Sequence, residues 1–98
     1  MFGLYYNMFM NNNSVNVFKA LADQTRLDIV RSLVKKPHDT ASCAQVSQCS
    51  SLSQPAMSHH FKKLVDADVI IEHKLGTEKN YELNHELFLS LGLDPSKL

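Results

Sequence analysis

Apolar and polar residues recur with a helical period between Ser53 and Val65. On a 3.6-residue wheel, one face of this stretch collects the apolar side chains Met57, Phe61, Leu64 and Val65. The opposite face carries amide, hydroxyl, imidazole and ammonium groups. Ser53 is suited to cap a helix, and Pro55 suits its first turn because no backbone N–H partner is lost there. The pattern predicts a helix with one buried face and one polar face.

Two helices are predicted upstream of this stretch. The first begins near Ser14, and its apolar face consists of Val15, Phe18, Leu21 and Ala22. The second covers residues 24–35, with Asp23 as N-cap and Pro37 as its stop. Its apolar side consists of Leu27, Ile29, Val30, Leu33 and Val34. Residues 37–40 are expected to form a loop.

Residues 42–52 predict a short helix followed by a tight turn. Ser42 and Gln45 have the spacing of a capping box. The helix is expected to run through Cys49 and to bury Cys43 and Val46 with it, and residues 50–52 form the turn. A short helix, a tight turn and a polar-faced second helix together indicate a helix-turn-helix.

A β-hairpin is predicted directly after the polar-faced helix. Residues 69–74 are rich in β-branched side chains, 75–78 have turn chemistry, and 79–83 alternate apolar with polar positions. Asn84 is suited to cap a last helix over 85–91, with Leu87, Phe88 and Leu91 apolar and Gly92 at its end. The expected fold is mainly α with a small β-hairpin, a winged helix-turn-helix.

We expect one DNA-binding domain over residues 14–92, with a tail at 93–98. Residues 1–13 form an N-terminal extension, apolar and aromatic in its first ten residues, that either covers a dimer or is disordered, and Met8 and Met10 are alternative starts. This run has no basic segment and is too short to span a bilayer, so we expect a cytoplasmic protein without a membrane partner.

Composition narrows the classes of function. The chain of 98 residues has ten basic and ten acidic side chains, so it cannot coat nucleic acid by bulk attraction. Two cysteines do not make a disulfide framework, and their spacing of six does not suit a shared metal. The sequence shows no glycine-rich phosphate loop, no paired carboxylates at a catalytically useful spacing and no nucleophile with a visible base, so we expect no enzyme and no cofactor.

Three blocks of the sequence resemble bacterial repressors of the ArsR/SmtB type. The run VFKALADQTRLDIV at 17–30 is similar to the opening of these proteins, and residues 52–64 to their recognition helix. Residues 69–71, a glycine-containing turn and residues 81–83 are similar to their wing. The resemblance covers about residues 15–84, with the blocks in the family's order and spacing.

This resemblance implies a homodimeric repressor that is paired through its terminal helices and leaves its operator when an inducer binds. The chain departs from the family at Gln24, where proline is usual. The family's metal-binding Cys-x-Cys is also missing, and Cys43 aligns with the apolar position between those cysteines. The histidine and carboxylate ligand pairs of the family's last helix are absent as well, so no metal site is expected.

The candidate DNA-binding residues lie on the polar-faced helix and the hairpin. Those on the helix are Gln54, Pro55, Ala56, Ser58, His59, Lys62 and Lys63, and those on the hairpin are Lys74, Gly76, Thr77 and Lys79. Gln54, Ser58 and His59 can exchange hydrogen bonds with base edges, whereas lysines suit phosphates. The alternative for each is a solvated surface or a plain turn. We expect His60 to be half-buried, and Arg26 to form a structural ion pair.

The predicted function is a dimeric, sequence-specific DNA-binding transcriptional regulator, a repressor by resemblance. Two recognition helices should enter successive major grooves of a pseudo-palindromic double-stranded operator, with half-sites roughly 10 bp apart. Two alternatives stay open at this point. One is a winged-helix module that binds another protein, and the other is a metal or thiol sensor with a non-standard site. The sequence does not identify the operator or the inducer.

Overall fold

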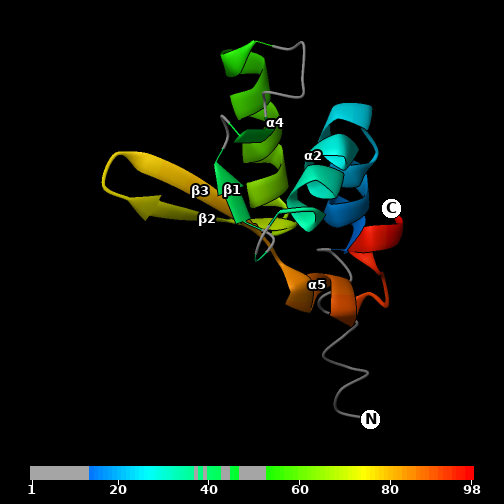
Figure 1. Ribbon diagram of the computed structural model, residues 1–98. Coiled ribbons are helices and arrows are strands. Elements are labelled where there is room, and N and C mark those ends of the chain that lie inside the picture. The colour runs from blue at the N-terminus through cyan, green and yellow to red at the C-terminus, as the bar shows by residue number, and fades with distance from the viewer. Residues whose placement is uncertain (1–13, 37, 39, 43–44, 47–52) are drawn as a thin grey trace.

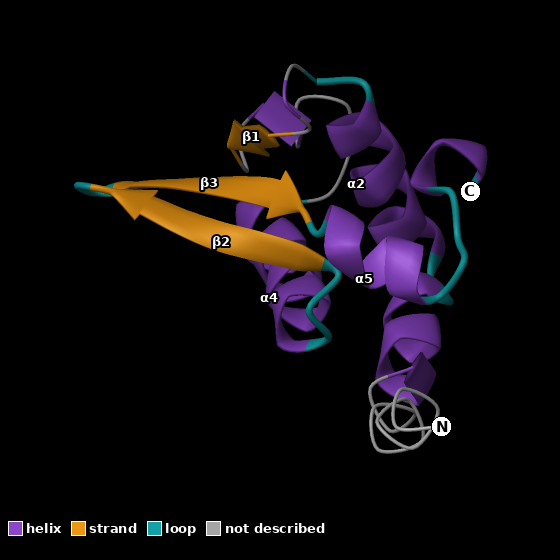
Figure 2. Ribbon diagram, turned by 90° about the horizontal axis from the view of Figure 1, so that it is seen from below, coloured by secondary structure: helices purple, strands orange, loops and turns teal. Residues whose placement is uncertain are grey.

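Helices packed against a small antiparallel sheet make up the described part of the chain. The computed structural model describes residues 14–36, 38, 40–42, 45–46 and 53–98, with the side chains of Gln54 and Leu75 left out. The hairpin of two longer strands projects beyond the helices (Figure 1, Figure 2). The mainly α fold with a hairpin wing is confirmed, and the N-terminal extension at 1–13 lies outside the described residues.

The first two helices begin close to where the sequence placed them. Residues 14–21 are helical, and α2 covers Gln24–Val34 with Asp23 as its N-cap and Lys35 as its C-cap. The Asp23 carboxylate accepts a hydrogen bond from the Arg26 backbone N–H at 3.0 Å. This satisfies one of the N–H groups that a helix start leaves without a partner.

The buried face of helix 14–21 differs from the prediction. Val17 and Ala20 are buried, whereas Val15 and Phe18 are 54% and 52% exposed. Leu21 is partly buried against the core, and Ala22 is exposed. This helix has apolar residues on two sides, so its period alone could not decide which side faces the core. No described part of the chain covers the side with Val15 and Phe18.

Helix α4, Gln54–Asp66, follows the predicted pattern closely. The Ser53 side chain accepts from the Ala56 backbone N–H, and Pro55 lies in the first turn. Met57, Phe61 and Leu64 are buried, and Val65 is partly buried. The predicted core-facing side of this helix is therefore confirmed.

The reciprocal capping box at Ser42 is also confirmed. The Ser42 hydroxyl accepts from the Gln45 backbone N–H, and the Gln45 side chain accepts from the Ser42 backbone N–H. Residues 45–46 are helical and Val46 is buried. The rest of this helix, the turn at 50–52 and the predicted burial of Cys43 and Cys49 lie outside the described residues.

The sheet has a third strand that the sequence did not predict. Its strands are β1 (Thr40–Ser42), β2 (Ile70–Leu75) and β3 (Glu78–Leu83), all antiparallel in the order β1-β3-β2. Thr40 was expected in a loop but pairs with Glu82, and the adjacent Ala41 is buried. Three residues are too few to show a strand period, so only the partner strand reveals β1. Gly76, with φ of 66°, supplies the left-handed conformation of the hairpin turn.

The C-terminal segment folds back onto the helices. Helix α5 covers His85–Ser90, with the Asn84 side chain accepting from the Leu87 N–H, and the left-handed Gly92 follows it as predicted. A 3-10 turn, η2, at Pro95–Lys97 then packs against α2, where Arg31 Nε donates to the Leu98 carbonyl at 2.7 Å. Leu93 and Leu98 contribute to the core from this segment. Among the described residues no helix is both long and apolar enough to cross a bilayer.

Candidate nucleic-acid interface

The polar face of α4 is open to solvent along its length. Pro55, Ser58, His59, Lys62 and Lys63 are exposed, and Ala56 is partly exposed. Met57, Phe61 and Leu64 on the other side anchor the same helix in the core. A helix held in this way can enter a major groove without losing its packing.

Two sets of contacts fix α4 in orientation. Phe61 packs on Tyr81 of β3 with ring centroids 4.4 Å apart. On the other flank, His60 Nδ1 lies 3.8 Å from Asp23 Oδ2 and 3.4 Å from Arg26 Nη1. The His60 side chain is only 18% exposed, which confirms the half-buried role expected of it. These contacts tie α4 to the wing and to the start of α2.

Arg26 stabilises the junction of the first two helices in a way the sequence did not predict. Its Nε donates to the Ala20 carbonyl at 2.6 Å, so its main partner is a helix-end carbonyl and not a carboxylate. Such a cation satisfies acceptors left over at a helix C-terminus. Next to it, the pKa of Asp23 is lowered because its carboxylate accepts the Arg26 backbone N–H, and the Arg26 and His60 charges act in the same direction.

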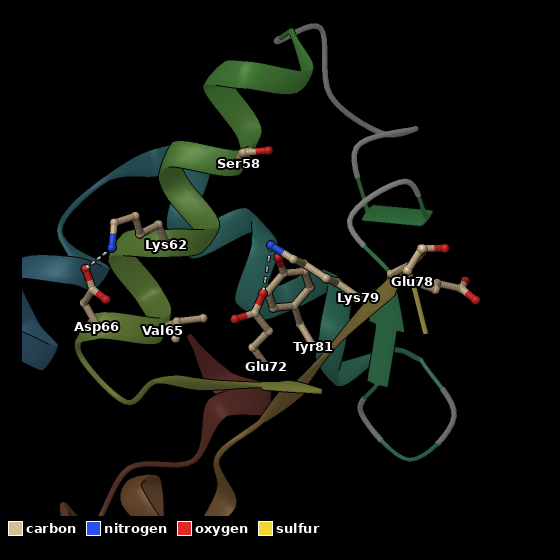
Figure 3. A pocket seen from close by; sticks show the side chains of 10 residues that line it. Ser58, Lys62, Val65, Asp66, Glu72, Glu78, Lys79 and Tyr81 are labelled. Atoms are coloured by element: carbon tan, nitrogen blue, oxygen red, sulfur yellow. Dashed lines mark hydrogen bonds and ion pairs between the residues drawn. The ribbon is translucent and has the colours of Figure 1, made fainter. Parts of the chain in front are cut away.

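A groove of about 720 Å³ separates α4 from the wing (Figure 3). Four of the predicted DNA-binding residues line it together: Ser58, Lys62, Thr77 and Lys79. The floor includes Val65 of α4 and Tyr81 of β3. Ser58 and Lys79, 21 positions apart in the sequence, thus face one space, as expected of a winged helix.

The other predicted site residues lie outside this groove. Lys63 lines a separate hollow of about 350 Å³ with Lys19 and Arg26. Lys74 and Gly76 are exposed on the wing, and Lys74 stands directly opposite Lys79 in the strand register. His59 is exposed on α4. The backbone of Gln54 starts α4, and its side chain is outside the described part of the structure.

Carboxylates pair with the lysines of the groove, which was not predicted from the sequence. Asp66 Oδ2 lies 3.3 Å from Lys62 Nζ, and Glu72 Oε1 lies 3.3 Å from Lys79 Nζ (Figure 3). Glu78 lines the same groove. The four-residue spacing of Lys62 and Asp66 on a helix could have indicated the first pair. The second depends on the strand register.

Metal-binding side chains do not gather in the described part of the chain. No group of three or more His, Cys, Asp or Glu residues is placed there to hold a metal ion. Cys43 and Cys49 are outside the described residues.

A solvent-facing helix beside a hairpin wing defines a winged helix-turn-helix protein of the DNA-binding class. A family described as "Helix-turn-helix domain" matches residues 21–73. The arsenical resistance operon repressor of Staphylococcus xylosus is 35% identical over 85 residues, which are 80% of this chain and 74% of that protein. The transcriptional repressor SdpR of Bacillus subtilis is 39% identical over 69 residues, covering 70% and 73% of the two chains.

Solved structures agree with these sequence matches. The transcriptional repressor PagR of Bacillus anthracis superposes with a TM-score of 0.71 at 25% identity, covering 86% of this chain and 93% of that one. The chain therefore belongs to the ArsR-type helix-turn-helix transcriptional regulators. It is a DNA-binding transcriptional repressor of that family.

Proposed function

We propose that this protein is a dimeric repressor that binds a pseudo-palindromic operator with α4 and the wing. The observation that carries the proposal is the open polar face of α4 next to the hairpin tip. Ser58 and His59 offer a hydroxyl and an imidazole to base edges, and Gln54 at the start of the helix adds an amide. Lys62, Lys63, Lys74 and Lys79 are placed to contact phosphates, which position the protein without sequence preference. Gly76 and Thr77 form the wing tip that approaches the backbone.

The dimer in this proposal is formed by the terminal helices. Val15 and Phe18 are exposed on helix 14–21, and Leu89 on α5 is 77% exposed. Large apolar side chains left uncovered at both ends of the described chain suit burial against a second copy. A two-fold dimer presents two α4 helices, so the proposed operator has two half-sites roughly 10 bp apart. We also propose a cytoplasmic location, because the protein has to reach this operator.

The proposal is tested by selecting bound sequences from a random duplex pool with the full chain. We expect enrichment of an inverted repeat, because both halves of a symmetric dimer read the same bases. The Ser58→Ala variant should broaden the preference at one position of each half-site, since a single base contact discriminates by about 1–3 kcal/mol. Asp28→Asn, an exposed change on α2, is the control and should leave the selected sequence unaltered.

Repeating the selection with added zinc and with oxidant separates the sensor alternatives. Loss of the selected sequence with either reagent would assign the release to a metal or a thiol. No enriched sequence under any condition would contradict the repressor proposal and favour a protein-binding module.

A further inference from the structure

The groove between α4 and the wing carries more negative than positive groups. Its lining includes two lysines, Lys62 and Lys79, against three carboxylates, Asp66, Glu72 and Glu78. DNA-binding surfaces are ordinarily much more positive than other protein surfaces. The space that faces a bound duplex here is therefore unusual for its function.

On the wing, the strand register places the carboxylate of Glu72 near Lys74 and Lys79. Lys74 is paired directly with Lys79 across the hairpin, and like charges in this arrangement destabilise a strand pair. Glu72 pairs with Tyr81 and is therefore the diagonal neighbour of Lys79, with its Oε1 3.3 Å from the Lys79 Nζ. Glu72 thus offsets the charge of Lys79, while Lys74 is exposed beside this pair.

On the helix, Asp66 holds Lys62 in the same way. The two residues are one helical turn apart, and their side chains are 59% and 74% exposed. Exposed pairs of this kind contribute little to stability, so folding alone does not account for them. The Asp66 carboxylate nevertheless lies well within a Debye length of any phosphate that Lys62 could contact, so its charge acts on that phosphate.

We propose that Asp66 and Glu72 are negative determinants of DNA affinity, which keep the groove lysines paired and make duplex binding depend on base contacts of α4. The inference rests on the proposed function, because it assumes that a duplex occupies the groove. Sequence-independent binding comes from lysines that displace counterions from phosphates. A lysine already paired with a carboxylate contributes less to this sequence-independent binding. The carboxylate also repels the phosphates that the lysine would contact. The neutral net charge of the whole chain has the same effect at long range.

The test measures affinity by fluorescence anisotropy for a labelled duplex of arbitrary mixed sequence, at several KCl concentrations. The variants are Glu72→Gln on the wing and Asp66→Asn on the helix. Asp28→Asn on α2 is the matched control, because it removes the same charge from an exposed ion pair, with Arg31, outside the groove. Each groove variant should bind roughly fivefold more tightly at 0.1 M salt and show a steeper salt dependence, by up to about 0.9 in slope per released lysine. The control should bind like the unaltered protein. Thermal melts followed by circular dichroism verify that all variants fold.

Four results would overturn this inference. Unchanged affinity in both groove variants would show that the carboxylates do not act on DNA. Weaker binding would show that they instead position the lysines for it. An equal gain in Asp28→Asn would assign the effect to net charge and not to placement. Failure of the random-pool selection together with the predicted gain on arbitrary duplex would refute sequence-specific repression while supporting the role of the carboxylates. No binding by any variant at low salt would overturn both.

Discussion

Phe61 of α4 packs against Tyr81 of β3 with ring centroids 4.4 Å apart and ring planes inclined by 35°. Both side chains are buried, and Tyr81 also lies at the floor of the groove. The contact joins α4, the helix proposed to read DNA, to the strand that carries the wing. It holds these two elements in a fixed relative position, which the proposed contact with one rigid duplex requires.

Removing this contact should destabilise the whole domain. Phe61→Ala is expected to lower the free energy of unfolding by about 3–5 kcal/mol, because it leaves a cavity under α4. Urea denaturation followed by circular dichroism measures the loss. Phe61→Leu, which keeps most of the volume, should cost less than half as much. Equal effects of the two substitutions would show that the aromatic ring itself, and not the volume that it fills, provides the stabilisation.

Asp68, just after the C-cap of α4, has a strained backbone conformation that a substitution can relieve. Asp68 has a φ of 62°, and the N–H groups of Asp68 and Val69 donate to the carbonyls of Val65 and Leu64. Gly92 has the same place after α5, with a φ of 69°. We expect Asp68→Gly to stabilise the protein by about 0.5–1 kcal/mol, and Gly92→Ala to destabilise it by about 1 kcal/mol, because a side chain is disfavoured in this conformation.

Urea midpoints of these two variants provide the measurement. Opposite shifts are the expected result. If Asp68→Gly instead lowers the midpoint, the aspartate side chain makes a contribution larger than the backbone strain.

The cap of α2 should make stability depend on acid pH. The hydrogen bond from the Arg26 N–H lowers the pKa of Asp23 below its ordinary 3.8. A lowered folded-state pKa means that the stabilisation is complete above pH 3.8 and disappears as the pH falls through the lower folded value. Asp23→Asn keeps a capping oxygen but no charge, so its stability should change less over that interval.

Unfolding free energies of both proteins at pH 7, 5, 4, 3 and 2.5 check this expectation. The difference between them isolates Asp23 from the other carboxylates. Parallel pH profiles would mean that the cap works equally well without its charge.

The exposed apolar side of helix 14–21 should govern association. Phe18→Glu is expected to weaken self-association at least about tenfold, because it places a charge in a surface that is proposed to be buried in the dimer. Sedimentation velocity at micromolar concentration distinguishes monomer from dimer. Lys35→Glu, an exposed change at the end of α2, is the control. A dimer that persists in Phe18→Glu would place the interface elsewhere.

Local signals made α4 predictable from sequence. Its serine cap, its proline in the first turn and its apolar stripe all fall within one 13-residue segment and agree with one another. The capping box at Ser42 and the glycine after α5 were predictable for the same reason. Each of these features depends on residues a few positions apart.

Features that depend on distant partners were not predictable. Strand β1 exists because Thr40–Ser42 pair with β3 some forty residues later. Both apolar sides of helix 14–21 fit a helical period. Which side is buried depends on packing against the rest of the core, which the local pattern does not show. The acidic residues of the groove were visible in the composition, but pairing Glu72 with Lys79 required the hairpin register.

The central claim is that the polar face of α4 and the wing tip contact DNA, and amide chemical shifts test it most directly. The duplex selected from the random pool would be titrated into ¹⁵N-labelled protein. DNA contact by α4 and the wing should shift the amides of residues 56–63 and 76–79 and leave those of α5 and η2 unaffected. Shifts confined to α5 and η2, with the α4 amides unchanged, would contradict it.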